Sequence, residues 1–168
     1  MKNRFLLISV FMLLLISLSG CQPSSPEINQ PKETYLEPDL AVLAEEILEL
    51  GTFPEMLVIS ENRLSKFYDI DAEQLQSFAV YLCAEAILSD EIILLRAKSE
   101  TDVDDLQKKV EARLAAQKKS FDDYLPKEGE KIGKVIFFKS HRDLLFVITE
   151  SPYREDITTH IEQAYQPD

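Results

Sequence analysis

The feature that most constrains the fold is a pattern that occurs twice: two short apolar runs followed by a segment with helical periodicity. The first pair of runs covers residues 77–84 and 90–97, and the second covers residues 134–139 and 144–149. Each run is short enough for one β-strand, and the residues between paired runs are typical of turns. The pattern therefore predicts two β-hairpins, each followed by a helix.

The two helices are predicted by apolar residues that recur three or four positions apart. The first helix begins near Thr101 and ends at Pro126 and Gly129. The second begins at Ser151-Pro152, where a helix cap precedes a first-turn proline. Their predicted buried faces are Val103, Leu106, Val110, Leu114 and Phe121 in the first helix, and Ile157, Ile161 and Tyr165 in the second.

The segment before the hairpins also contains helical signals. Residues 40–50 have helical spacing, with Asp39 as the N-cap and Gly51 as a left-handed stop. After a short apolar stretch, Ser60 begins a predicted short helix, and residues 71–74 have the spacing of a capping box. One or two helices are therefore expected before the first hairpin.

Together these signals predict a single α+β domain over residues 39–168. We expect a mainly antiparallel four-stranded sheet in ββαββα order, with helices packed on one face and one or two helices before it. Residues 91–95 can be aligned with residues 143–147. The two ββα units are therefore either an internal duplication or two units that share only a general likeness.

The N-terminus has the layout of a signal peptide over residues 1–20. A short basic start precedes an apolar run over residues 5–18, which at about 1.5 Å per residue is shorter than the roughly 30 Å hydrocarbon core of a bilayer. Residues 18–21, Leu-Ser-Gly-Cys, resemble a bacterial lipobox. The resemblance implies cleavage before Cys21 and a diacylglyceryl group on its sulfur, whose acyl chains hold the protein to the membrane.

Residues 21–38 form the predicted lipid-anchored tether, because they contain four prolines and few apolar groups. Cleavage removes Lys2 and Arg4 and changes the net charge from −12 to −14. Such an acidic chain repels phosphate backbones, which argues against a nucleic-acid partner. After acylation of Cys21, Cys83 is the only thiol, and we expect it to be a small buried hydrophobe rather than a nucleophile.

The sequence contains no recognisable catalytic or metal-binding motif. His141 is predicted to lie in a hairpin turn and His160 on a helix surface, so neither activates a nucleophile. Asp102, Asp104 and Asp105 are predicted to stabilise a helix start rather than to bind calcium, because the glycine that a calcium loop needs is missing. We therefore expect no catalytic residue, no cofactor and no metal.

One exposed surface is a candidate binding site: Phe121, Asp122, Asp123, Tyr124 and Leu125. Large apolar side chains next to carboxylates could receive a cationic peptide or an amine. The alternative is that the rings fold back onto the helix and close its end.

Four segments resemble an uncharacterised family of small lipoproteins found in Firmicutes: Phe53-Pro54-Glu55-Met56, FYDIDAEQLQSFAVYL, SDEIILLRAKS and EARLAAQKKSFDDYLP. The likeness covers most of residues 39–166. The family is classed as a domain of unknown function. The resemblance therefore implies a place on the outer leaflet of the cell membrane of a Gram-positive bacterium and transfers no catalytic residue.

These inferences predict a lipid-anchored, extracytoplasmic and non-enzymatic module that binds an envelope protein or peptide, with its acidic surface contributing to specificity. A first alternative is an envelope enzyme or enzyme accessory built from scattered carboxylates and Tyr. A cleft with a pair of carboxylates of raised pKa would favour this alternative. A second alternative is a small-solute-binding lipoprotein, although residues 39–168 are few for two lobes that close about a hinge.

Overall fold

The computed structural model describes residues 36–167, so the predicted signal peptide, Cys21 and most of the predicted tether lie outside the described residues. The described residues belong to one compact unit, Thr34–Asp168. Its helices and strands are, in chain order, α2 (Leu40–Leu50), β1 (Met56–Val58), α3 (Glu61–Tyr68), β2 (Leu75–Cys83), β3 (Glu91–Ala97), α4 (Val103–Tyr124), α5 (Pro126–Ile132), β4 (Ile136–Ser140), β5 (Asp143–Ile148) and α6 (Arg154–Ala164), with 3-10 turns at Ala72–Gln74, Glu100–Asp102 and Ser151–Tyr153.

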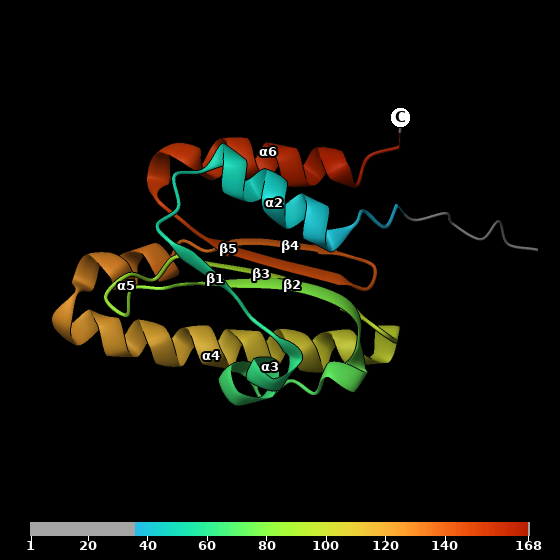
Figure 1. The fold of residues 1–168 in the computed structure, drawn as a ribbon, viewed down its shortest axis with the longest axis horizontal. Helices are drawn as coiled ribbons and strands as arrows, with labels where there is room; N and C mark the ends of the chain where they lie inside the picture. Colours follow the sequence, from blue (N-terminus) through green and yellow to red (C-terminus); the bar gives the residue numbers. More distant parts are fainter. Residues whose placement is uncertain (1–35, 168) are drawn as a thin grey trace, which may run out of the picture. The chain divides into compact units, whose positions relative to one another are not determined.

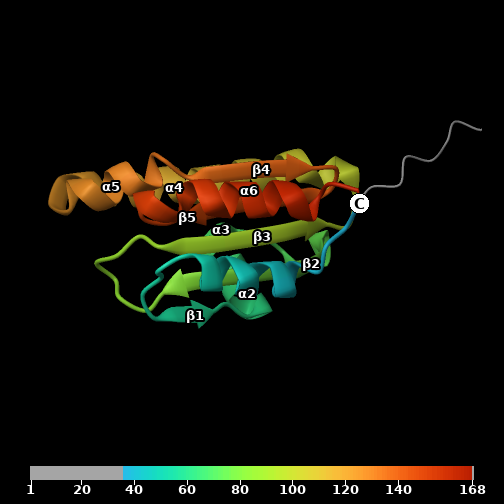
Figure 2. The ribbon, with the colours of Figure 1, turned by 90° about the horizontal axis from the view of Figure 1, so that it is seen from above.

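The strands form one antiparallel sheet in the order β1-β2-β3-β5-β4 (Figure 2). The predicted hairpins are β2–β3 and β4–β5, and the pairing of β3 with β5 joins them. The α+β class and the antiparallel sheet are thus confirmed. The sheet has five strands rather than the expected four, because part of the short apolar stretch before Ser60 pairs with the end of β2, where Met56 lies opposite Cys83.

Helices cover both faces of the sheet, whereas we expected them on one face. α3 and α4 pack on one face, and α2 and α6 pack on the other (Figure 1). The reason lies in β3 and β5, which are buried along their whole length. Ile93 and Leu95 belong to the core under α4, and Ile92 and Leu94 belong to the core under α2 and α6. Because successive side chains of a strand point to opposite faces, a strand that is apolar throughout needs a layer of helices on each side.

The positions of α4 and α6 bear on the two similar ββα units. When a rotation superimposes two such antiparallel hairpins of one sheet, it maps each face of the sheet onto itself. In a simple duplication, the helices that follow the two hairpins would therefore lie on the same face. α4 and α6 lie on opposite faces. The two units are therefore not related in the way that a simple duplication would give.

Two helix ends differ from the prediction. Gly51 follows α2 in an extended conformation, with φ −95° and ψ 167°, and not in the left-handed one. A Cβ at this position would lie 2.4 Å from Cε2 of Phe53, so the glycine makes room for that ring. Pro126 does not only end α4 but also begins α5, where the missing N–H of proline removes no hydrogen bond. The long helix therefore breaks at Leu125 and a second helix follows.

Candidate functional site

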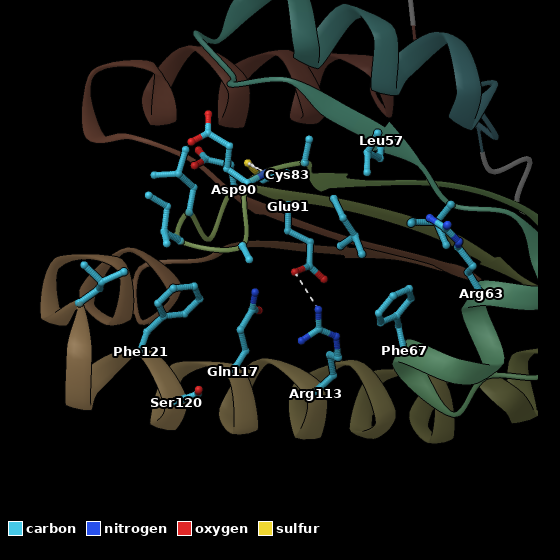
Figure 3. Close-up of a pocket in the computed structure, with 18 of the residues that line it drawn as sticks. Leu57, Arg63, Phe67, Cys83, Asp90, Glu91, Arg113, Gln117, Ser120 and Phe121 are labelled. Atoms are coloured by element: carbon cyan, nitrogen blue, oxygen red, sulfur yellow. Dashed lines mark hydrogen bonds and ion pairs between the residues drawn. The ribbon is translucent and has the colours of Figure 1, made fainter.

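A cleft of about 760 Å³ opens on the face of the sheet that α3 and α4 cover. α3 and β1 contribute to one wall, α4 forms the opposite wall, and the loop between β2 and β3 closes one end (Figure 3). We call it the α4 cleft.

Exposed apolar side chains gather around the α4 cleft. Ten large hydrophobic side chains of residues 36–167 are exposed, and five of them line this cleft: Leu57, Phe67, Ile87, Tyr124 and Leu125. Ile87 and Tyr124 protrude most, with 61% and 77% of their surface exposed. A clustered apolar surface on a folded monomer is typical of a site that binds another molecule.

The floor of the α4 cleft contains Glu91, the first residue of β3. Only 1% of its surface is exposed, and its carboxylate accepts a hydrogen bond from the Tyr68 hydroxyl and lies 3.6 Å from Nη2 of Arg113. The Arg113 guanidinium also lies over the rings of Phe67 and Tyr68, 6.0 and 5.4 Å from their centroids. Burial raises the pKa of Glu91, although Arg113 opposes this shift. Burial and the Glu91 charge raise the pKa of Tyr68.

Two buried polar atoms of this floor have no hydrogen-bond partner in the part of the chain that the structure describes. They are Nε of Arg113 and Oε1 of Gln117. The first is a donor and the second an acceptor, and the two residues stand about one turn apart on α4. A peptide group that reached the floor would offer the complementary acceptor and donor.

A buried ion-pair network lies behind the end of the α4 cleft. Nζ of Lys131 lies 2.8 Å from Asp90, 3.0 Å from Glu128 and 3.3 Å from Glu150. Ser89 donates two hydrogen bonds to the Glu128 carboxylate, from its N–H at 2.8 Å and from its hydroxyl at 2.7 Å. Burial raises the pKa of Asp90, and Lys131 only partly opposes it. Burial disfavours the charge on Lys131, but Asp90 and Glu128 outweigh this effect and raise the pKa of Lys131.

The structure brings three of the five residues of the predicted binding surface to the rim of the α4 cleft: Phe121, Tyr124 and Leu125. Phe121 packs partly against the core, whereas Tyr124 projects into solvent. Asp122 and Asp123 do not line the cleft, and Asp122 instead pairs with Lys118 on the preceding turn of α4 at 2.7 Å. The acidic half of the predicted surface is therefore separate from its apolar half.

Cys83 lies at the α4 cleft, whereas His141 and His160 lie outside it. Cys83 is half-buried at the end of β2, lines the α4 cleft and is less buried than we expected, and burial raises the pKa of its thiol. His141 lies in the turn between β4 and β5, as predicted, with φ 50° and with Nε2 3.1 Å from Glu100. Nε2 of His160 lies 2.9 Å from a Glu46 oxygen on α2.

Two of the three acidic residues at the start of α4 form ion pairs with lysines. Asp104 pairs with Lys139 and Asp105 with Lys109, each at 3.0 Å, while Asp102 precedes the first residue of the helix. Within residues 36–167 no group of three or more His, Cys, Asp or Glu side chains could hold a metal ion. None of the helices in that range is long and apolar enough to cross a bilayer.

A second charged network ties the start of the described chain to the centre of the sheet. Arg96 of β3 binds Asp143 of β5 through two hydrogen bonds of 2.8 and 2.7 Å and donates to the Pro38 carbonyl at 2.9 Å. Arg142 pairs with Glu37 at 2.6 Å. We call this network the Arg96 clamp, and its buried pairing of β3 with β5 gives it a structural role.

Sequence reasoning missed most of the α4 cleft. Leu57, Phe67 and Ile87 come from β1, α3 and the loop after β2, and no spacing in the sequence links these segments. Two local signals were present. Glu91 is a carboxylate at the head of an apolar run, and Ile87 is a large apolar residue in a predicted turn.

Comparison with known protein families gives a match over most of the described domain. The profile of a family described as "Domain of unknown function (DUF4358)" matches residues 50–149, which include the whole sheet and the whole α4 cleft. No curated protein and no solved structure shows significant similarity to the chain. Because the matched residues make up more than half of the chain, it belongs to the DUF4358 family, whose function is unknown.

Proposed function

We propose that this protein is a lipid-anchored, extracytoplasmic lipoprotein that binds an extended apolar segment of another envelope protein or peptide in the α4 cleft. The observation that carries the proposal is that half of the exposed large hydrophobic side chains of residues 36–167 line this one cleft. The lipobox-like residues 18–21 support the location.

The strand beside the cleft favours a polypeptide over other apolar ligands. Among residues 36–167, β1 is an edge strand that pairs with β2 alone, so its outer edge has backbone N–H and C=O groups without a strand partner in that range. Leu57 of β1 lines the cleft and Val58 is exposed. An extended segment can bind such an edge through backbone hydrogen bonds while its alternate side chains enter the neighbouring cleft.

The charges of the cleft favour a segment without net charge. Glu91 pairs with Arg113, and Asp90 pairs with Lys131 behind the cleft. The two other charged residues of the lining, Arg63 and Glu85, are of opposite sign. The lining holds two cations and three carboxylates, a surplus of one negative charge that Lys131 offsets from behind, so apolar contacts supply most of the affinity.

Photocrosslinking in intact cells tests this proposal. A photoreactive amino acid at Ile87 or Tyr124 of the full-length lipoprotein should crosslink one and the same envelope protein. The matched control is Val42, which is 51% exposed but lies on α2, on the other face of the sheet, and should give no such product. Leu57→Asp should reduce the crosslink at Ile87 at least about tenfold. Products that do not differ between Ile87 and Val42 would contradict the proposal.

The anchor has its own test. Labelled palmitate should be incorporated into the wild-type protein and not into Cys21→Ser, and Cys21→Ser should leave the membrane fraction. Because the α4 cleft lies far along the chain from residue 21, the purified Cys21→Ser protein should still bind the crosslinked partner. Membrane association of Cys21→Ser equal to that of the wild type would contradict lipid anchoring.

One observation favours a second candidate function, an envelope enzyme or enzyme accessory. Asp90 and Glu91 both line the cleft, and burial raises the pKa of both carboxyl groups, which is common in active sites. Asp90 is already paired with the buried Lys131, and Glu91 with the half-buried Arg113. Glu91→Gln separates the candidates, because Gln keeps an acceptor for Tyr68. A binding module should retain its crosslinked partner, whereas an enzyme should lose its turnover.

A further inference from the structure

A second cavity, of about 290 Å³, lies where α5 and the residues after it meet the end of β5 and the start of α6. No residue lines both this cavity and the α4 cleft. Arg154, the first residue of α6, and Thr149, directly after β5, both line it. We call it the Arg154 pocket.

The guanidinium of Arg154 has no partner within residues 36–167. Its Nη1 is buried without a hydrogen bond. Burial alone lowers the pKa of this group, and no carboxylate opposes the shift. Arg154 is only partly buried as a whole, but removing part of a cation from water without a counterion is unfavourable. In a chain with 30 acidic and 18 basic residues, such a cation is a sign that a bound anion completes the site.

Thr149 gives a second and independent sign of a ligand. Only 1% of its surface is exposed, and its Oγ1 has no hydrogen-bond partner among the described residues. Buried hydroxyl groups in folded proteins are nearly always hydrogen-bonded. Thr149 and Arg154 therefore bring two unused donors to one small cavity.

The remaining charges of the lining define the sign of the ligand. Three cations of the lining have no ion-pair partner in the described part of the chain: Lys127, Lys134 and Arg154. Two of the three lining acids, Glu128 and Glu150, pair with Lys131. Counted over the whole lining, four cations face three acids, so the surplus is one positive charge.

We propose that the Arg154 pocket binds the phosphate group of a small soluble molecule. The Arg154 guanidinium and the Thr149 hydroxyl donate directly to its oxygens, and Lys127 and Lys134 contribute charge from the rim. A phosphate ester carries about −1.5 to −2 charges at pH 7, opposite in sign to the surplus of the lining, and its three acceptor oxygens suit the unused donors. The pocket is at the small end of ligand sites, which limits the molecule to little more than its phosphate and a short carbon chain.

Titration of inorganic phosphate into the full-length lipoprotein in a non-ionic detergent, at constant ionic strength, tests this proposal. Calorimetry should show one site per chain. Arg154→Gln should lower the affinity at least about tenfold, and the isosteric Thr149→Val should lower it severalfold. The control Lys66→Gln changes the net charge equally but is exposed and lines neither cavity, and it should bind phosphate as the wild type does.

A second measurement separates a binding role from a structural one. Without phosphate, neither Arg154→Gln nor Thr149→Val should lower the midpoint of thermal unfolding, because each removes a buried group that has no partner. A lower midpoint for both variants would show a structural role and overturn the proposal. Equal phosphate affinity of Arg154→Gln and the wild type would overturn it as well. Binding to vesicles that contain phosphatidic acid, without binding of inorganic phosphate, would place the phosphate on a lipid and overturn the assignment to a soluble molecule.

Discussion

Replacement of Lys131 by Met should destabilise the domain by about 3–5 kcal/mol at pH 7, the usual loss when one member of a buried ion pair is removed. Met fills a similar volume but carries no charge. Most of this loss of stability arises because Asp90 is left as a buried, unpaired carboxylate. Its side chain is 3% exposed, and among the described residues only one of its oxygens is hydrogen-bonded, the one that binds Lys131. Glu128 keeps its bonds from Ser89, and Glu150 is 61% exposed, so both contribute less.

The loss of unfolding free energy in Lys131→Met should depend on pH. Burial raises the pKa of Asp90 even beside Lys131, and removal of Lys131 raises it further. A carboxyl group whose pKa is higher in the folded state than in the unfolded state destabilises the fold as pH rises between the two values. The Lys131→Met protein should therefore regain stability as pH falls from 7 toward 4. The raised pKa of Lys131 stabilises the wild type at all pH values below about 10.4, so its contribution does not change in this range.

Urea unfolding of Thr34–Asp168, followed by far-ultraviolet circular dichroism, measures this loss. With a slope of roughly 2 kcal/mol per molar urea, the midpoint should fall by roughly 1.5–2.5 M. Lys134→Met is the matched control, because Lys134 is exposed, and should change stability by less than about 0.5 kcal/mol. The double variant Lys131→Met, Asp90→Asn should regain part of the loss. Equal midpoints for Lys131→Met and Lys134→Met, or a loss that stays constant down to pH 4, would refute the reasoning.

Three further predictions use other features of the fold. Leu94→Ala and Leu95→Ala should each destabilise the domain by about 2–5 kcal/mol, because both side chains are fully buried but lie on opposite faces of β3; a small effect of either would contradict the double-sided core. Asp39→Ala should cost about 1 kcal/mol in the same urea assay, because its carboxylate caps α2, and Asp39→Ser should retain most of this stability. Cys83 should react with a disulfide reagent more slowly than free cysteine at pH 7, because burial raises its thiol pKa; equal rates would contradict this.

The helices and hairpins were predictable because their signals are local. The apolar face of α4 repeats within a few residues, and the Asp39 carboxylate accepts from the N–H groups two and three residues on, those of Ala41 and Val42. β1 was not predictable in this way, because a three-residue strand depends on a partner at the far end of β2. The second layer of helices did have a signal, since residues 91–97 form a nearly continuous apolar run without alternation.

The site was predictable only at its rim. Tyr124 and Leu125 stand out where a helical pattern breaks, and they do border the α4 cleft. The floor depends on Glu91 meeting Arg113 and Tyr68, three residues from three separate elements. The unused donors of the Arg154 pocket have no sequence signature, because a missing partner is a property of the folded arrangement.

The Arg96 clamp has a mechanical consequence. It fastens Pro38 to Arg96 of the central strand β3, and Glu37 to Arg142 in the turn before β5, just before α2 begins. A pulling force applied at residue 36 therefore acts first on the buried centre of the sheet. α2 follows the point of attachment in the chain. A pulling force on the N-terminal side of the domain would therefore have to break the Arg96 clamp before it could unwind α2.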